Sequence, residues 1–148
     1  MKTLLLLFLT ITTTTFAQKP TGTLRGTVVF KRGNLMPGPN RPQAPSTRGQ
    51  PVKREIRIYE LTKMAQATPR SDGFYKSVKT KLIRKVRSDS RGRFRVSLST
   101  GMYSVFVLEP GKGLYANVFD GEMNALPVEV RAGKTTTVEV EINYAAVY

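Results

Sequence analysis

Basic side chains are concentrated in one stretch of this 148-residue chain, whose formal net charge is +14. Ten lysines and arginines lie between Arg70 and Arg95, and only Asp72 and Asp89 oppose them, which leaves a local charge of +8. Such side chains bind carboxylates, sulfates and phosphates through charge-assisted hydrogen bonds. The alternative interpretation is a solvated strand face whose charges block pairing with another sheet edge. The candidate polyanion-binding residues are Arg84, Lys85, Arg87, Arg93 and Arg95.

A second stretch, residues 111–121, combines aromatic and polar side chains. An aromatic ring offers a sugar a flat apolar face, and amide and carboxylate oxygens accept hydrogen bonds from its hydroxyls. The alternative is that both rings fold back and cap one end of the domain. A calcium site is not predicted, because the chain lacks the Asp-x-Asp-x-Asp-Gly loop. The candidate carbohydrate-binding residues are Tyr115, Asn117, Phe119 and Asp120.

The chain contains no histidine and no cysteine. It therefore has no Ser-His or Cys-His pair, no metal site built on these residues, and no disulfide. Paired carboxylates act in a cleft, and nothing in the sequence predicts one. We expect no catalytic residues, no cofactor and no metal, and a hydrolase of unrecognised type is the least favoured alternative.

Residues 1–17 have the organisation of a secretory signal peptide. Met1-Lys2 forms a short positive region, Leu4 to Leu9 an apolar region, and Thr15-Phe16-Ala17 a cleavage site. The apolar run is too short to cross a bilayer, and no second one follows. We expect a secreted or periplasmic chain of one domain, residues 18–148, with no transmembrane segment and a charge of +13 once Lys2 is lost.

Apolar and polar residues alternate with a period of two along most of this domain, which predicts β-strands. The strand at 102–108 is apolar on both faces, so it should lie in the middle of a sheet. Long loops are expected at about 32–53, rich in proline and glycine, and at about 62–79. Seven short strands separated by turns predict an all-β fold, a seven-stranded Greek-key β-sandwich. The predicted strands cover about 24–30, 55–59, 81–88, 93–98, 102–108, 128–130 and 136–142.

The turn Asp89-Ser90-Arg91-Gly92 is predicted to close a β-hairpin, because Asp bonds the backbone ahead of it and Gly accepts a positive φ. Arg93 and Arg95 then share one strand face, and Lys85 and Arg87 lie on the adjacent strand. Cross-strand neighbours are about 5 Å apart, so these charges should form a compact positive patch on the hairpin.

The same turn carries a resemblance to a known family. Residues 88–96 give its turn-and-strand signature, and the first strand follows a Gly-x-x-x-Gly-x-Val pattern from Gly22 to Val28. The chain resembles the carboxypeptidase regulatory-like domain, a β-sandwich related to transthyretin (prealbumin). It departs from that family at Thr100, where proline often precedes the glycine, and in its two long loops. The other matching residues are Leu98, Gly101, Tyr103, Pro127-Val128-Glu129-Val130 and Gly133.

The resemblance implies an exported, non-catalytic module that supports or binds another component. It transfers no catalytic residue, and it implies structural roles for Gly92, Phe94 and Tyr103. Related pilin-type sandwiches form a Lys–Asn isopeptide bond beside an acidic residue. Lys31 and Asn143 lie near the first and last predicted strands, roughly where that Lys–Asn pair lies. No buried acid between them can be named, so two ordinary strand-end side chains are the favoured interpretation.

We therefore expect an exported, non-catalytic binding or structural module of the cell envelope. Its partner is expected to be an anionic glycan or another protein, engaged through the basic hairpin. Nucleic acid is disfavoured, because export argues against it and the basic stretch lacks aromatics spaced for base stacking. The alternatives are a carbohydrate-binding module that uses the 111–121 loop and, less favoured, a hydrolase.

Overall fold

The computed structural model of the chain describes residues 18–36 and 48–148. The predicted signal peptide, residues 1–17, lies outside the described residues, as does the middle of the predicted loop at 32–53. None of the described residues forms a helix long and apolar enough to cross a membrane. The elements are β1 (Thr21–Asn34), β2 (Gln50–Pro51), β3 (Glu55–Glu60), the 3-10 turn η2 (Met64–Gln66), β4 (Ala67–Pro69), β5 (Tyr75–Val78), β6 (Leu82–Arg87), β7 (Arg93–Ser99), β8 (Gly101–Glu109), β9 (Gly113–Tyr115), β10 (Pro127–Val130) and β11 (Thr135–Val147).

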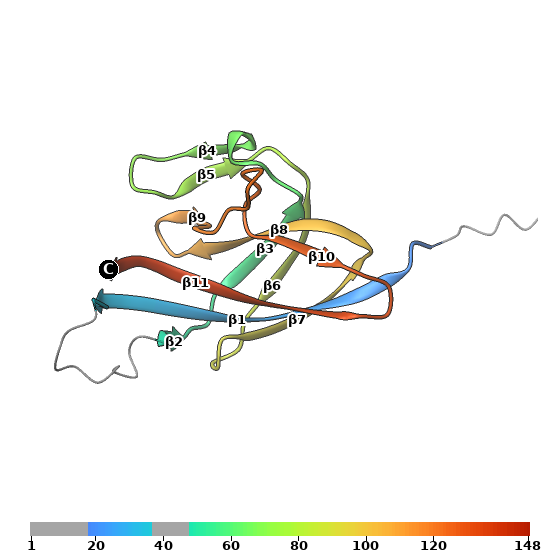
Figure 1. The fold of residues 1–148 in the computed structure, drawn as a ribbon, viewed down its shortest axis with the longest axis horizontal. Coiled ribbons are helices and arrows are strands. Elements are labelled where there is room, and N and C mark those ends of the chain that lie inside the picture. Colours follow the sequence, from blue (N-terminus) through green and yellow to red (C-terminus); the bar gives the residue numbers. More distant parts are fainter. Residues whose placement is uncertain (1–17, 37–47) are drawn as a thin grey trace, which may run out of the picture.

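The strands form two sheets packed as a sandwich (Figure 1). In the first sheet β1 lies between β11 on one side and β7 and β2 on the other. The second sheet has the order β4-β5-β9-β8-β3-β6, and β10 also pairs with β8. All seven predicted strands are present, as β1, β3, β6, β7, β8, β10 and β11. The fold is therefore the predicted all-β, Greek-key sandwich. It has eleven strands among the described residues instead of the seven predicted, because the short strands β2, β4, β5 and β9 are added.

Strand β1 organises the first sheet because it has partners on both sides. It runs parallel to β11 from Thr23 to Asn34 and antiparallel to β7 from Thr21 to Thr27. The first and last strands of the domain are thus neighbours, and they tie its two ends together.

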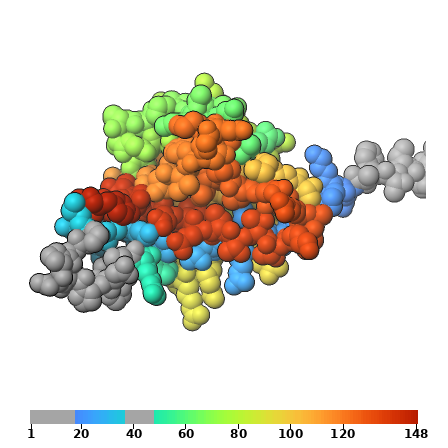
Figure 2. Space-filling view, in the orientation of Figure 1, coloured from blue at the N-terminus to red at the C-terminus, as the bar shows by residue number. Residues whose placement is uncertain are grey.

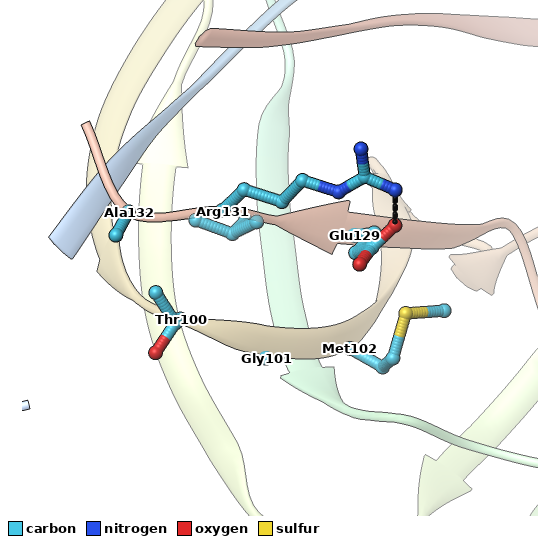
Figure 3. A pocket seen from close by; sticks show the side chains of 7 residues that line it. Thr100, Gly101, Met102, Glu129, Arg131 and Ala132 are labelled. Atoms are coloured by element: carbon cyan, nitrogen blue, oxygen red, sulfur yellow. Dashed lines mark hydrogen bonds and ion pairs between the residues drawn. The ribbon is translucent and has the colours of Figure 1, made fainter. Parts of the chain in front are cut away.

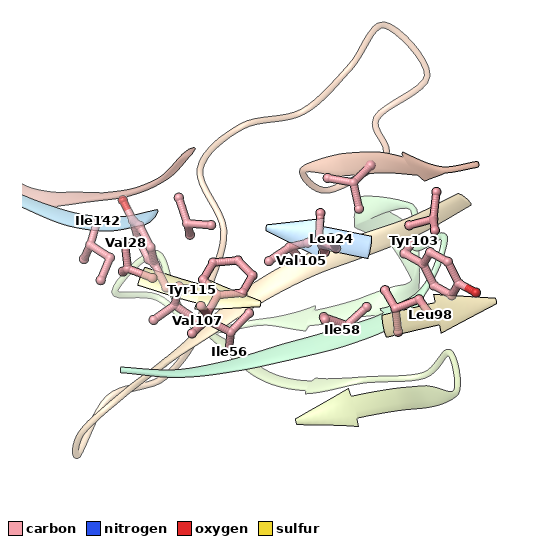
Figure 4. Packing of buried hydrophobic residues seen from close by; sticks show 14 of the residues in the cluster. Leu24, Val28, Ile56, Ile58, Leu98, Tyr103, Val105, Val107, Tyr115 and Ile142 are labelled. Atoms are coloured by element: carbon pink, nitrogen blue, oxygen red, sulfur yellow. The ribbon is translucent and has the colours of Figure 1, made fainter. Parts of the chain in front are cut away.

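Inward-facing residues of both sheets form the main core (Figure 4). Strand β8 is central, with β3 on one side and β9 and β10 on the other, as its two apolar faces predict. Burying each branched aliphatic side chain contributes about 1.5–3 kcal/mol before the entropy of folding is counted. The fully buried members are Leu24, Val28, Ile56, Ile58, Val105, Val107 and Ile142.

A second apolar layer covers the outer face of the second sheet. There Phe106 of β8 makes edge-to-face contacts with Tyr59 and with Tyr75. This layer changes the prediction for residues 62–79: in place of an irregular loop, the segment contains η2 and the β4–β5 hairpin. The strands were missed because each has only three or four residues, too few to show a period.

The predicted hairpin at 89–92 is instead a corner between the two sheets. Strand β6 pairs with β3 in the second sheet, whereas β7 pairs with β1 in the first. Ser88, which is buried, anchors the corner, because its hydroxyl accepts a hydrogen bond from the Arg54 amide (2.8 Å) and donates one to the Val52 carbonyl (2.9 Å). The hairpin prediction is wrong. The local hydrogen bonds of the turn, such as that from the Gly92 N–H to the Asp89 carbonyl (3.0 Å), form whether the next strand joins the same sheet or the other one. The turn residues therefore do not distinguish a hairpin from a corner.

Gly92 is expected to be the most sensitive residue of this corner. Its φ is +71°, and a Cβ there would lie 2.3 Å from the Val28 carbonyl oxygen. Gly111 has a similar φ, +72°, but open space around it. In urea unfolding we expect Gly111→Ala to lose about 1–2 kcal/mol from the left-handed backbone. Gly92→Ala should lose about 1–3 kcal/mol more from overpacking, and equal losses would contradict the close approach.

Candidate functional site

The basic residues of the central stretch gather along one edge of the sandwich. Strand β6 is the last strand of the second sheet, and β7 flanks β1 in the first, so the corner at 88–92 joins two strands on the same side of the molecule (Figure 1). We call this surface the basic edge. Its exposed cations are Lys81, Arg84, Lys85, Arg87, Arg91, Arg93 and Arg95.

This arrangement corrects the predicted patch. All five predicted polyanion-binding residues lie on the basic edge, but they do not form one face of a hairpin. In the second sheet, Lys85 and Arg87 of β6 are the register partners of Arg57 and Glu55 of β3. In the first sheet, Arg93 and Arg95 of β7 have their register partners on β1. The charges are therefore divided between two sheets. Like charges remain in directly paired positions, because Lys85 is the register partner of Arg57 and Arg95 is that of Arg25.

On the β6 side, one acid offsets part of the charge. Arg57 Nε donates a hydrogen bond of 2.8 Å to Glu55 Oε1. This hydrogen bond lowers the pKa of Glu55, burial opposes the change, and the charges of Arg57, Lys85 and Arg87 lower it further. Glu55 is therefore ionised at neutral pH and Arg57 is occupied by it, so the other cations of this side, Lys85 and Arg87 among them, are the ones that face solvent.

On the β7 side, the sheet supplies a cation that the sequence interpretation missed. Arg25 of β1 is the register partner of Arg95, and both are exposed. Two arginines are thus cross-strand neighbours on the outer face of the first sheet. The alternation of β1 marks Arg25 as outward-facing, but only the pairing of β1 with β7 places it beside Arg95.

Asp89 orders the turn that carries Arg91 and Arg93. Its Oδ1 accepts hydrogen bonds from the amides of Arg91 (2.9 Å) and Arg93 (2.8 Å), and its Oδ2 lies 3.0 Å from a guanidinium nitrogen of Arg93. The backbone hydrogen bond from Arg93 is the largest of several effects that lower the pKa of Asp89 below its ordinary value of 3.8. Arg93 is therefore partly occupied, which distinguishes it from Arg95.

The Asp89 carboxylate should make the stability of the corner depend on pH. Because its pKa is lowered in the folded state, its contribution is present above the ordinary pKa and is lost as the pH falls through the lowered value. We expect Asp89→Asn to be less stable than the parent at pH 7, and the difference to shrink at acidic pH, where the parent carboxyl is also neutral. Urea unfolding at several pH values tests this, and a difference independent of pH would contradict it.

The predicted carbohydrate platform is not formed as expected. Tyr115 is only 7% exposed and packs in the main core, where its hydroxyl donates to Asn143 Oδ1 (2.7 Å). Asn117 donates to the same oxygen (2.6 Å), and Phe119 packs against the outer apolar layer. The rings fold back, which is the alternative that the sequence left open, so neither Tyr115 nor Phe119 presents a flat face to a sugar.

Asp120 is also used inside its own loop. Its Oδ1 accepts from the amides of Glu122 (3.0 Å) and Asn124 (2.8 Å), and its Oδ2 accepts from the Asn124 amide group (2.8 Å). These bonds, led by that from the Asn124 side chain, lower the pKa of Asp120. Within residues 18–36 and 48–148, no group of three or more acidic residues is arranged to hold a metal ion.

One buried acid escaped the sequence interpretation. Glu109, at the end of β8, is only 2% exposed. Its Oε1 accepts from Arg54 Nε, and its Oε2 accepts from the Tyr144 hydroxyl (3.0 Å). The Tyr144 ring also contacts the rings of Phe30 and Phe74, with centroids 5.5 and 5.1 Å away. These contacts fasten the end of β11 to the second sheet, so we interpret Glu109 as structural.

Tyr144→Phe should measure this fastening. The variant keeps the ring contacts but leaves Oε2 of the buried Glu109 without its hydroxyl donor. We expect a loss of about 1–3 kcal/mol in the free energy of unfolding. Tyr148→Phe is the matched control, because that hydroxyl is at the exposed end of the chain and accepts only a weak 3.3 Å hydrogen bond from Asn143. Equal effects of the two substitutions would remove the special role of Glu109.

The side chains of Lys31 and Asn143, considered for an isopeptide bond, have other partners. Lys31 Nζ lies 2.6 Å from Glu141 Oε1 in an ion pair across β1 and β11. The Asn143 side-chain oxygen accepts from Tyr115 and Asn117. This agrees with the favoured interpretation of two strand-end side chains.

Comparison with known proteins adds little to this picture. No family model matches the chain, and no curated protein matches it. One similar solved structure is that of GBS52, the minor pilin of the Gram-positive pathogen Streptococcus agalactiae, with 18% sequence identity and a TM-score of 0.38. The match covers 84% of this chain and 45% of the pilin chain, so this chain spans less than half of that protein. At this similarity the fold rests on the sheet order described above, and no function is transferred.

Proposed function

We propose that this chain is an exported, non-catalytic binding or structural module whose basic edge engages an anionic partner outside the cytoplasm. Membership of the carboxypeptidase regulatory-like family is part of this proposal and rests on the turn-and-strand resemblance. The non-catalytic part rests on the composition, which lacks histidine and cysteine. Export rests on the organisation of residues 1–17.

The concentration of charge on the basic edge is the observation that carries the proposal. Seven exposed cations lie along two adjoining strands and their corner, and Arg25 adds an eighth beside them. Among the described residues, Arg93 is the one cation of the basic edge with an ion-pair partner within 4.0 Å, namely Asp89. Unpaired cations at one edge create a positive potential that attracts polyanions and accelerates their association.

Edge protection is the rival explanation for these charges. Charged side chains on an edge strand prevent pairing with the edge of another sheet. The two roles differ in what they predict when the charges are removed: polyanion binding falls in one case, and self-association rises in the other. Both can be measured on the same variant.

We expect the quadruple variant Arg84→Ser, Lys85→Ser, Arg87→Ser and Arg95→Ser to elute from a heparin column at much lower salt than the parent. Each lost contact should also flatten the dependence of log affinity on log salt by about 0.7–0.9. These side chains are exposed, so the fold should be retained, which circular dichroism and size-exclusion chromatography check.

A control with the same loss of charge separates a site from net charge alone. The variant Lys63→Ser, Lys76→Ser, Lys79→Ser and Lys134→Ser removes four exposed cations that belong neither to β6 and β7 nor to their corner. It should keep most of the retention of the parent. Equal loss in both variants, or retention unchanged with increased self-association of the first, would overturn the proposal.

A further inference from the structure

A groove opens on the basic edge between the facing margins of the two sheets. Its volume is about 600 Å³, within the range of ligand clefts. One wall comes from the start of β6, with Lys81, Ile83 and Arg84, and the other from the end of β7, with Leu98. It exists because the corner at 88–92 sends β6 and β7 into different sheets, so their ends are not joined by a ladder.

The charge of the groove is positive but mixed. Lys19, Lys81 and Arg84 line it, and Glu60 is the acid among its lining residues. Lys19, Lys81, Arg84 and Glu60 are all exposed. Three cations and one carboxylate suit a ligand that carries separated negative charges and also hydroxyl groups, because Glu60 can accept hydrogen bonds that a dense polyphosphate could not donate.

The remaining surface of the groove has two characters. Apolar side chains line part of it, among them Leu98 and Tyr103, whose hydroxyl is already bonded to the Ser99 carbonyl (2.7 Å). Hydroxyl side chains line it as well, and they are those of Thr21, Ser97, Ser99 and Thr100. A lining that combines apolar, hydroxyl and cationic side chains matches an acidic sugar, which has an apolar face, hydroxyls and a carboxylate or sulfate.

The groove also continues beyond its own end. A second, open hollow of about 440 Å³ shares Thr100, Gly101 and Met102 with it. Arg131 and Glu129 line this hollow, and Figure 3 shows the Arg131 side chain extended along β10 toward Glu129, to which it is bonded at 2.7 Å. Two hollows that meet at one turn form a path for a ligand longer than a single sugar.

Nucleic acid fits the groove less well than an acidic glycan. Single-stranded nucleic acids bind through bases stacked on exposed aromatic rings. The aromatic residue that lines the groove is Tyr103, and it is buried, with 7% of its surface exposed. No base could stack on it without moving the core.

We infer that this groove is a binding site for an acidic oligosaccharide, whose carboxylate or sulfate groups bind Lys19, Lys81 and Arg84. The inference rests on the proposed function and gives its partner a chemical class and a place. The cations of the basic edge outside the groove, Arg87, Arg91 and Arg95 among them, then attract the polymer, and the groove holds a few of its sugar units.

Isothermal titration calorimetry with three hexasaccharides tests this: a galacturonic acid hexamer, a heparin-derived hexamer and a neutral glucose hexamer. The first two probes distinguish a carboxylate from a sulfate as the group recognised. We expect measurable binding of at least one acidic hexamer and none of the neutral hexamer. Lys81→Ala with Arg84→Ala should weaken that binding by about tenfold or more, the scale of a lost charge-assisted hydrogen bond.

The control is Arg87→Ala with Arg91→Ala, which removes the same charge from the basic edge but leaves the groove lining unchanged. Its affinity for the acidic hexamer should stay within about threefold of the parent, since exposed charges at a distance are screened by salt. Similar losses in the two double variants, or equal binding of a thymidine hexanucleotide, would overturn the inference.

The result also separates this inference from the proposed function. The groove is not the binding site if no hexamer binds, or if the groove variant binds as the parent does. If the quadruple variant still loses heparin retention in that case, the basic edge remains a polyanion-binding surface. If heparin retention of the quadruple and control variants is also equal, both proposals fail.

Discussion

The corner between β6 and β7 is the constraint on which the rest of this structure depends. Ser88 anchors it to the segment just before β3. The Gly92 carbonyl accepts a hydrogen bond from the Val28 amide (2.8 Å) in the middle of β1. The corner thereby touches both sheets and fixes their separation at one edge. It also decides that six cations on β6, β7 and their turn lie along an edge instead of on one face.

That placement changes which charges face one another. A hairpin would set Lys85 and Arg87 opposite Arg93 and Arg95, where like charges destabilise the pairing. In the sandwich, Lys85 is paired with Arg57 and Arg95 with Arg25, and two nearby acids, Glu55 and Asp89, bind Arg57 and Arg93. The edge therefore keeps like charges in paired positions, and the two acids offset them only in part.

The region where β8 and β11 end is built on a different principle. There the buried Glu109 carboxylate accepts hydrogen bonds from Arg54 and Tyr144, whose side chains are only partly covered, and Tyr115 and Asn143 add a second hydrogen-bonded pair. The Arg54 backbone is also bonded to Ser88, so this cluster and the corner are neighbours. The fold thus joins a hydrogen-bonded cluster that holds β11 against the second sheet to the corner from which the charged edge extends.

Local alternation in the sequence was enough to place the strands, because a period of two shows which side chains face inward whatever partner a strand later finds. It located all seven main strands, the central position of β8 and the turn chemistry of Asp89 and Gly92. It did not reveal which strands pair, since a turn of Asp-Ser-Arg-Gly closes the same local bonds in a hairpin and in a corner. The pairing of Arg25 with Arg95, the gathering of Lys19 and Arg84 in the lining of one groove, and the burial of Tyr115 all depend on contacts between residues far apart in the chain. Tertiary structure alone decided these, because long-range pairing is selected by the packing of the whole core and leaves no periodic mark in the sequence.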